Sequence, residues 1–137
     1  MTNTLPSEIY WLTLSVVLTA LMVLPYAAYR MNKLGGLWQV FLRPLPGDAP
    51  FPDAAWAHRT YRAHMNAFEG LALFAPLAIA VHVTGTSNPV TEMSCAVYFW
   101  SRLLYAPLYY FEVPVLKTSV WFVGLGATMV LAYQLLM

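Results

Sequence analysis

The sequence RAHMNAFE, residues 62–69, decides how this chain is interpreted, because it places charged and polar side chains at the start of a long apolar run. Arg62, Asn66 and Glu69 stand at positions i, i+4 and i+7, so on a helix they share one face. Charged groups inside a membrane are costly and need a partner or a function. The stretch therefore predicts a membrane helix that carries a polar site.

The composition of the chain is that of a membrane protein. Of its 137 residues, 60% are hydrophobic and 9% are charged. A soluble domain typically carries about 25% charged residues. The length predicts one domain over residues 1–137. The net charge is +1 and there is no basic run, so no nucleic-acid partner is expected.

Four segments are long and apolar enough to cross a bilayer core, which requires about 20 residues. They cover residues 9–29, 64–83, 90–111 and 115–136. The connection over residues 30–61 contains Gly35, Gly36 and several prolines, and it is expected to be a long loop. The predicted fold class is therefore an all-α integral membrane protein, a bundle of four transmembrane helices.

The basic residues predict the orientation of the bundle. They lie in or beside the first connection, or in the third segment and at the start of the fourth: Arg30, Lys33, Arg43, Arg59, Arg62, Arg102 and Lys117. The positive-inside rule then places the first and third connections in the cytoplasm and both termini outside. A short chain with a proline-rich loop suits a bacterial inner membrane.

A second set of polar residues lies in the third segment. Arg102, Tyr105, Tyr109 and Glu112 stand at i, i+3, i+7 and i+10, again on one helical face. Both polar stripes lie toward the predicted cytoplasmic end. Two interpretations are open. Glu69 pairs with an arginine and locks the bundle, or the two stripes bind a small zwitterionic anion together.

The chemistry of these side chains suits such a ligand. Arginine forks recognise carboxylates in bidentate fashion, and a glutamate receives an ammonium group. Tyrosine hydroxyls and an arginine also donate hydrogen bonds to a thiolate, which lowers the pKa of a bound thiol. The alternative use of Glu69, as the proton and cation site of a small proton-coupled efflux protein, requires no arginine-tyrosine stripes.

The pattern of motifs resembles the MAPEG family, the membrane-associated proteins of eicosanoid and glutathione metabolism. The second segment carries Arg62-Ala63-His64-x-Asn66-x-x-Glu69, followed by Phe74, and the third carries Arg102-x-x-Tyr105-x-x-x-Tyr109, followed by Pro114 and Lys117. The likeness covers residues 59–121 most closely. Many members of the family have an arginine where this chain has Lys117, which is a point charge without the planar fork.

The resemblance implies a homotrimer that binds glutathione as co-substrate between subunits, near the cytoplasmic face, and takes a lipophilic second substrate from the bilayer lipids. The residues it assigns to glutathione are Arg30, Arg62, His64, Asn66, Glu69, Arg102, Tyr105 and Tyr109, and those it assigns to catalysis are Arg102, Tyr109 and Lys117. The activity it implies is that of a glutathione transferase or peroxidase resembling the microsomal enzymes. A non-catalytic lipid-binding or scaffold protein of the same family is the alternative.

Three further residues carry expectations of their own. Cys95 is expected on the opposite side of the third segment from the polar stripe, which argues against a catalytic thiol. Glu8 and Glu92 are expected to be solvated at the outer face. The scattered histidines and the single cysteine do not form a metal site.

Overall fold

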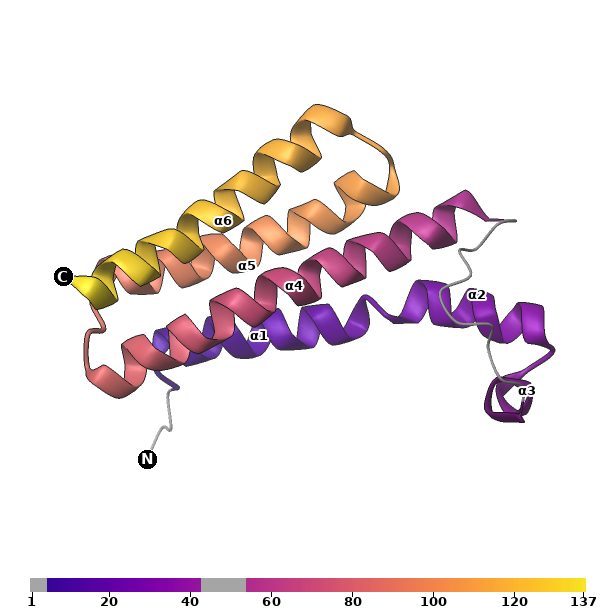
Figure 1. The fold of residues 1–137 in the computed structure, drawn as a ribbon, viewed down its shortest axis with the longest axis horizontal. Coiled ribbons are helices and arrows are strands. Elements are labelled where there is room, and N and C mark those ends of the chain that lie inside the picture. The colour runs from indigo at the N-terminus through magenta and orange to yellow at the C-terminus, as the bar shows by residue number, and fades with distance from the viewer. Residues whose placement is uncertain (1–4, 43–53) are drawn as a thin grey trace.

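The computed structural model describes residues 5–42 and 54–137, and it is built from helices. Four long helices lie side by side (Figure 1), and two shorter ones follow the first of them. In chain order they are α1 (Ser7–Leu21), α2 (Leu24–Leu34), α3 (Leu37–Leu42), α4 (Ala55–Thr84), α5 (Pro89–Tyr110) and α6 (Pro114–Leu136). The expectation of an all-helical membrane protein is confirmed.

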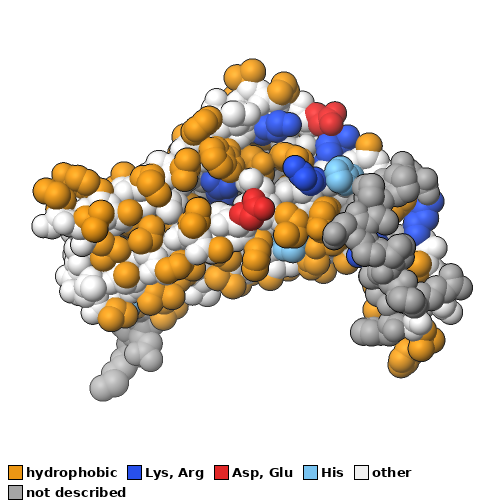
Figure 2. Space-filling model, in the orientation of Figure 1, with side chains coloured by type: hydrophobic (Ala, Val, Ile, Leu, Met, Phe, Trp, Pro, Cys, Tyr) orange, Lys and Arg blue, Asp and Glu red, His pale blue; other side chains and the backbone are white. Residues whose placement is uncertain are grey.

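Three stretches among the described residues are long and apolar enough to cross a membrane: Ser7–Leu34, Ala55–Thr84 and Pro114–Leu136. Helix α5 matches the third predicted segment to within a residue at each end but is not among these three stretches. The fourth crossing therefore stays a prediction. Apolar side chains cover much of the surface over the long helices (Figure 2), as lipid contact requires.

The first predicted span is interrupted. Helix α1 ends at Leu21, and α2 begins at Leu24 with Pro25 in its first turn. Proline has no N–H to continue the hydrogen bonds of the preceding helix, and its fixed φ suits the first turn of a new one. The chain therefore breaks and restarts within the segment that hydropathy alone presents as continuous.

The prediction of a loop over residues 30–61 was wrong at both ends of that range. Helix α2 continues to Leu34, α3 occupies Leu37–Leu42, and α4 begins at Ala55, well before the apolar run. Gly35 does end a helix, because its φ of 85° is a left-handed conformation that glycine adopts readily. The prolines between residues 43 and 53 lie outside the described residues.

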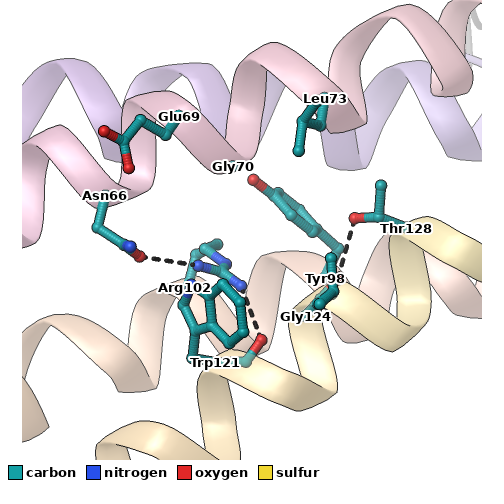
Figure 3. Close-up of a pocket in the computed structure, with 10 residues that line it drawn as sticks. Asn66, Glu69, Gly70, Leu73, Tyr98, Arg102, Trp121, Gly124 and Thr128 are labelled. Atoms are coloured by element: carbon teal, nitrogen blue, oxygen red, sulfur yellow. Dashed lines mark hydrogen bonds between the residues drawn. The ribbon is translucent and has the colours of Figure 1, made fainter.

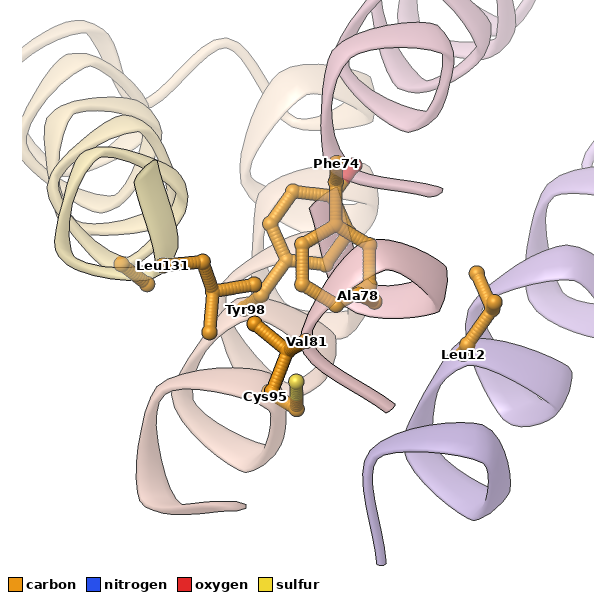
Figure 4. Packing of buried hydrophobic residues seen from close by; sticks show 8 residues of the cluster. Leu12, Phe74, Ala78, Val81, Cys95, Tyr98 and Leu131 are labelled. Carbon is orange, nitrogen blue, oxygen red and sulfur yellow. The ribbon is translucent and has the colours of Figure 1, made fainter. Parts of the chain in front are cut away.

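The core of the bundle is aromatic where α4 and α5 meet. The rings of Phe74 and Tyr98 stack with their centroids 3.8 Å apart, and Cys95, Val81 and Leu131 pack around them (Figure 4). The expectation for Cys95 was wrong. Residues 95 and 102 are seven apart, two helical turns, so Cys95 shares the inward face of α5 with the polar residues.

One end of the bundle is held by a polar group that we call the Glu8 cluster: Glu8, Ser87, Asn88, Thr91 and Gln134. Glu8 Oε1 accepts hydrogen bonds from Ser87 Oγ at 2.6 Å and Thr91 Oγ1 at 2.8 Å. Asn88 donates to Gln134 Oε1 at 3.0 Å and caps α5. Glu8 is only 1% exposed, so the expectation that water solvates it was wrong, whereas Glu92 is exposed. These bonds place the start of α1 and the end of α6 at the same end of the bundle.

Candidate functional site

Three helices converge on Arg102, which lies midway along α5. Its side chain is 4% exposed. Arg102 Nη1 donates to Asn66 Oδ1 of α4 at 3.4 Å, and Nη2 donates to the backbone carbonyl of Trp121 in α6 at 3.2 Å. The guanidinium therefore links α4, α5 and α6 at one point, shown in Figure 3.

Two tyrosines of α5, one turn before and one turn after Arg102, have their rings close to the guanidinium. Its carbon lies 5.2 Å from the ring centroid of Tyr98 and 5.7 Å from that of Tyr105. Cation–π attraction of this kind gains strength where water is excluded. We call Asn66, Tyr98, Arg102, Tyr105 and Trp121 the Arg102 cluster.

Two glycines make room for this arrangement. A Cβ at Gly124 of α6 would collide with the Arg102 guanidinium and with the Ser101 hydroxyl. A Cβ at Gly70 of α4 would lie 3.1 Å from the Tyr98 hydroxyl oxygen. The close approach of α6 to Arg102 thus depends on a glycine at position 124, where a side chain of any size displaces the arginine.

A cavity of about 400 Å³ opens beside the cluster, between α4 and α5. Its lining contains polar and charged side chains from both predicted stripes: Tyr61, Arg62, Met65, Asn66, Glu69, Tyr105 and Tyr109. Lys117, at the start of α6, lies over the Tyr109 ring with Nζ 4.8 Å from its centroid. Members of both predicted stripes therefore line one opening, and the predicted lysine lies against Tyr109 in its wall.

A second, smaller cavity of about 170 Å³ lies deeper, between α4, α5 and α6. Asn66 and Glu69 border both cavities, and the remaining lining residues of the deeper one are Gly70, Leu73, Tyr98, Arg102, Trp121, Gly124, Leu125 and Thr128 (Figure 3). Its polar lining comes from Asn66, Glu69, Tyr98, Arg102 and Thr128. The predicted site thus extends into the bundle beyond the residues that the sequence pattern indicated.

Two of the predicted ligand residues lie elsewhere. His64 shares a hydrogen bond of 2.8 Å with Tyr26 of α2, on the face of α4 opposite to Arg62 and Asn66. Arg30 lies one turn after Tyr26 on α2. Neither residue borders the two cavities described above. Within a single chain they form a separate group, and their assignment to glutathione stays a prediction.

The interpretation of Glu69 as a lock has no support in the described part of the chain. Over residues 5–42 and 54–137, Glu69 forms no ion pair with Arg62 or Arg102. Glu112, the last member of the α5 stripe, turns instead to Arg59 of α4, whose Nη1 lies 3.3 Å from its carboxylate. Arg59 also donates to the Tyr110 carbonyl at 3.1 Å, so this pair closes the end of α5.

Four residues of the site escaped the sequence interpretation: Gly70, Tyr98, Trp121 and Gly124. A signal for three of them was present. Tyr98 stands four residues before Arg102, on the same face, and Trp121 and Gly124 follow Lys117 at i+4 and i+7. The sequence contains no such signal for Gly70, because the role of this residue depends on the approach of the Tyr98 hydroxyl.

The fold and the site together describe a helical membrane protein with a polar, tyrosine-rich pocket. A scan against protein-family models matches residues 9–137 to the model of the MAPEG family. The chain belongs to the MAPEG family, as the sequence motifs predicted. A search of curated proteins and a search of solved structures each gave no match.

Proposed function

We propose that the protein binds glutathione in the larger cavity and activates it as a thiolate. The observation that carries this proposal is the convergence of Arg62, Glu69, Tyr105 and Tyr109 on one opening, with Lys117 beside it. A volume of about 400 Å³ lies in the range of small-molecule sites. The family is associated with glutathione and eicosanoid metabolism, which supports the same ligand.

The side chains around the opening match the groups of a tripeptide thiol. Arg62 is exposed at the mouth, where its fork suits a carboxylate. Glu69 suits the ammonium group, and the amide of Asn66 suits the peptide backbone. The hydroxyls of Tyr105 and Tyr109 are the donors for a thiolate, whose charge Arg102 and Lys117 stabilise.

The proposed reaction is nucleophilic attack by the bound thiolate. With an electrophilic lipophile, the sulfur forms a bond to carbon, and the displaced group or added electron pair takes up a proton. With a lipid hydroperoxide, the sulfur attacks the O–O bond and the leaving alkoxide is protonated to an alcohol. The resulting sulfenic acid condenses with a second glutathione to give the disulfide and water. Positioning and a lowered thiol pKa supply the rate.

The setting of this reaction is part of the same proposal. The lipophilic substrate enters from the bilayer, which concentrates apolar molecules. The subunits form a homotrimer, in which a neighbouring chain covers the open side of the cavity and brings Arg30 and His64 toward glutathione. Under this proposal the cavity faces the cytoplasm from a bacterial inner membrane, with both termini outside; the positive-inside rule supports the orientation, because Arg62 and Lys117 lie near the cavity.

A non-catalytic lipid-binding or scaffold role is the second candidate, and Lys117 is the residue that favours it. A lysine lacks the fork with which an arginine engages a thiolate in two bonds, and here the ammonium lies over a tyrosine ring. Such a protein keeps its fold and its oligomer but does not ionise glutathione.

The test is the ultraviolet absorbance of the glutathione thiolate, followed at neutral pH during titration of the detergent-solubilised protein. We expect saturable thiolate formation. Tyr109→Phe should weaken it by roughly tenfold, because one hydrogen bond to a charged sulfur is lost. Tyr110→Phe is the matched control, since Tyr110 is the next residue and does not line the cavity.

Each result of the titration has a consequence. Thiolate formation that Tyr109→Phe weakens and Tyr110→Phe preserves supports the enzyme. Binding of glutathione without thiolate absorbance favours the scaffold role. Absence of binding at millimolar glutathione, from protein shown to be a folded oligomer, contradicts the proposal and revives Glu69 as the proton site of an efflux protein.

A further inference from the structure

Two residues that line the smaller cavity have a buried polar atom without a hydrogen-bond partner among the described residues. These atoms are the Tyr98 hydroxyl oxygen and Arg102 Nε. Tyr98 is 1% exposed and its hydroxyl lies against Gly70, on the cavity side of α5 (Figure 3). A buried donor left without an acceptor is destabilising, so each such group needs an explanation.

Arg102 adds a charge to the same place. Among the described residues it forms no ion pair with a carboxylate; its two partners are the Asn66 amide oxygen and the Trp121 carbonyl. Both are neutral. Burying a cation without an opposite charge is expensive, most of all inside a membrane helix. Glu69 borders the cavity but is exposed, and its carboxylate lies beyond Asn66 (Figure 3).

From these groups we infer that the smaller cavity binds one small monovalent anion, as a free ion of halide size or as the anionic end of an amphiphile. A guanidinium N–H and a phenol O–H are donors, so their shared ligand is an acceptor. Water accepts hydrogen bonds but leaves the charge of Arg102 uncompensated. The cavity of about 170 Å³ has room for an ion with a few waters.

The shape of the cavity is set by the two glycines. Gly70 leaves space in front of the Tyr98 hydroxyl, and Gly124 lets the guanidinium lie against α6. Leu73, Trp121 and Leu125 supply the apolar part of the wall, and the other polar residues that line it are Asn66, Glu69 and Thr128. Asn66 Oδ1 already accepts from Arg102, and Thr128 Oγ1 donates to the Gly124 carbonyl. Glu69 repels a second negative charge, so the unpaired donors favour a small anion or a single anionic head.

The test compares thermal unfolding of the detergent-solubilised protein in sodium chloride and in sodium gluconate at equal ionic strength. Gluconate carries several hydroxyl groups, for which the largely apolar cavity offers few hydrogen-bond partners. We expect chloride to raise the melting temperature by a few degrees in a saturable manner, because a ligand that binds only the folded state stabilises it. Sodium octanoate, below its micelle concentration in gluconate, is the second arm.

The variants distinguish a built site from a general salt effect. Tyr98→Phe keeps the stacked ring on Phe74 and removes the hydroxyl, so at least half of the chloride shift should disappear. Tyr133→Phe is the matched control, because Tyr133 lies exposed on α6 away from the cavity, and it should retain the full shift. Arg102→Gln is a second variant that should abolish the shift.

Each outcome decides the inference. A chloride shift that depends on Tyr98 and Arg102 establishes a free anion, and an equally dependent octanoate shift without a chloride shift establishes an anionic head group. Equal melting temperatures in chloride, octanoate and gluconate overturn the inference, as does a shift that Tyr98→Phe leaves unchanged. The inference shares Arg102 with the proposed glutathione site, but these titrations contain no glutathione, so either proposal can fail while the other stands.

Discussion

The two buried polar clusters of this bundle differ in how fully their hydrogen-bonding groups are paired. In the Glu8 cluster, a carboxylate that is 1% exposed accepts two short hydrogen bonds from Ser87 and Thr91. In the Arg102 cluster, a guanidinium that is 4% exposed has two neutral partners and one unsatisfied nitrogen, and two cavities open next to it. Among the described residues, the Glu8 cluster has no buried side-chain atom without a hydrogen-bond partner, whereas the Arg102 cluster has two, Arg102 Nε and the Tyr98 hydroxyl oxygen.

The difference shows that a buried charge can serve either stability or ligand binding. A buried charge whose acceptors or donors are all used holds helices together and has no capacity left for a ligand. A buried charge with unused donors beside a cavity is held in place by packing, at a cost that only a ligand offsets. We therefore expect changes in the Glu8 cluster to alter stability, and changes in the Arg102 cluster to alter binding.

The largest effect should come from Arg102→Gln. Hydrogen bonds to a charged group contribute about 1.5–3 kcal/mol, so glutathione affinity should fall roughly 10- to 100-fold. The free energy of unfolding should change little, because the lost bonds to Asn66 and Trp121 are offset by removal of a buried cation. Titration of glutathione against the purified variant measures the first quantity, and an unchanged affinity would remove Arg102 from the site.

The next largest effect should come from Glu8→Ala. The hydroxyls of Ser87 and Thr91 lose their shared acceptor, which should lower the free energy of unfolding by about 2 kcal/mol. Glu8→Gln is the control, because its amide oxygen still accepts both bonds. Thermal unfolding in detergent compares the two variants, and equal stability of Glu8→Ala and the wild type would contradict the structural role of this cluster.

A smaller effect should follow Gly124→Ala. The added methyl group displaces the Arg102 guanidinium, and overpacking of this kind costs about 1–3 kcal/mol of stability. Gly126 provides a matched control two residues away, because a Cβ there meets open space within 4 Å. Glutathione titration and thermal unfolding of both variants should show a loss for Gly124→Ala and no change for Gly126→Ala.

The smallest effect should come from Arg59→Gln. The ion pair with Glu112 is partly exposed, and such pairs contribute about 0–1 kcal/mol. The bond to the Tyr110 carbonyl adds a contribution of the same size. The variant should unfold at nearly the wild-type temperature and bind glutathione normally, and a large loss of binding would show that Arg59 positions Tyr109 through the end of α5.

The sequence predicted most of the long helices, and the errors have local causes. Helices α5 and α6 begin and end within about a residue of the predicted segments. Hydropathy did not reveal the break before Pro25, because the residues next to it, 21–24 and 26–28, are all apolar. It also missed the first turns of α4, where the residues from Ala55 to Arg62 are mixed in polarity but helical.

The sequence predicted which site residues share a face of one helix, but not how the helices contact one another. The spacing of Arg62, Asn66 and Glu69 placed them on one wall of the larger cavity. The register between helices is a tertiary property, so the partners of Arg102 in α6 and the glycine that admits it could not be derived. The predictions for Cys95 and Glu8 were wrong because the burial of these residues depends on that register.

The most direct test of this account is the melting temperature of three proteins, the wild type, Glu8→Ala and Arg102→Gln, with and without saturating glutathione. Glu8→Ala should melt below the wild type yet gain the full glutathione-dependent rise, whereas Arg102→Gln should melt near the wild type and gain little. If Arg102→Gln keeps the full rise, or folded Glu8→Ala loses it, the assignment of binding to the Arg102 cluster and of stability to the Glu8 cluster is wrong.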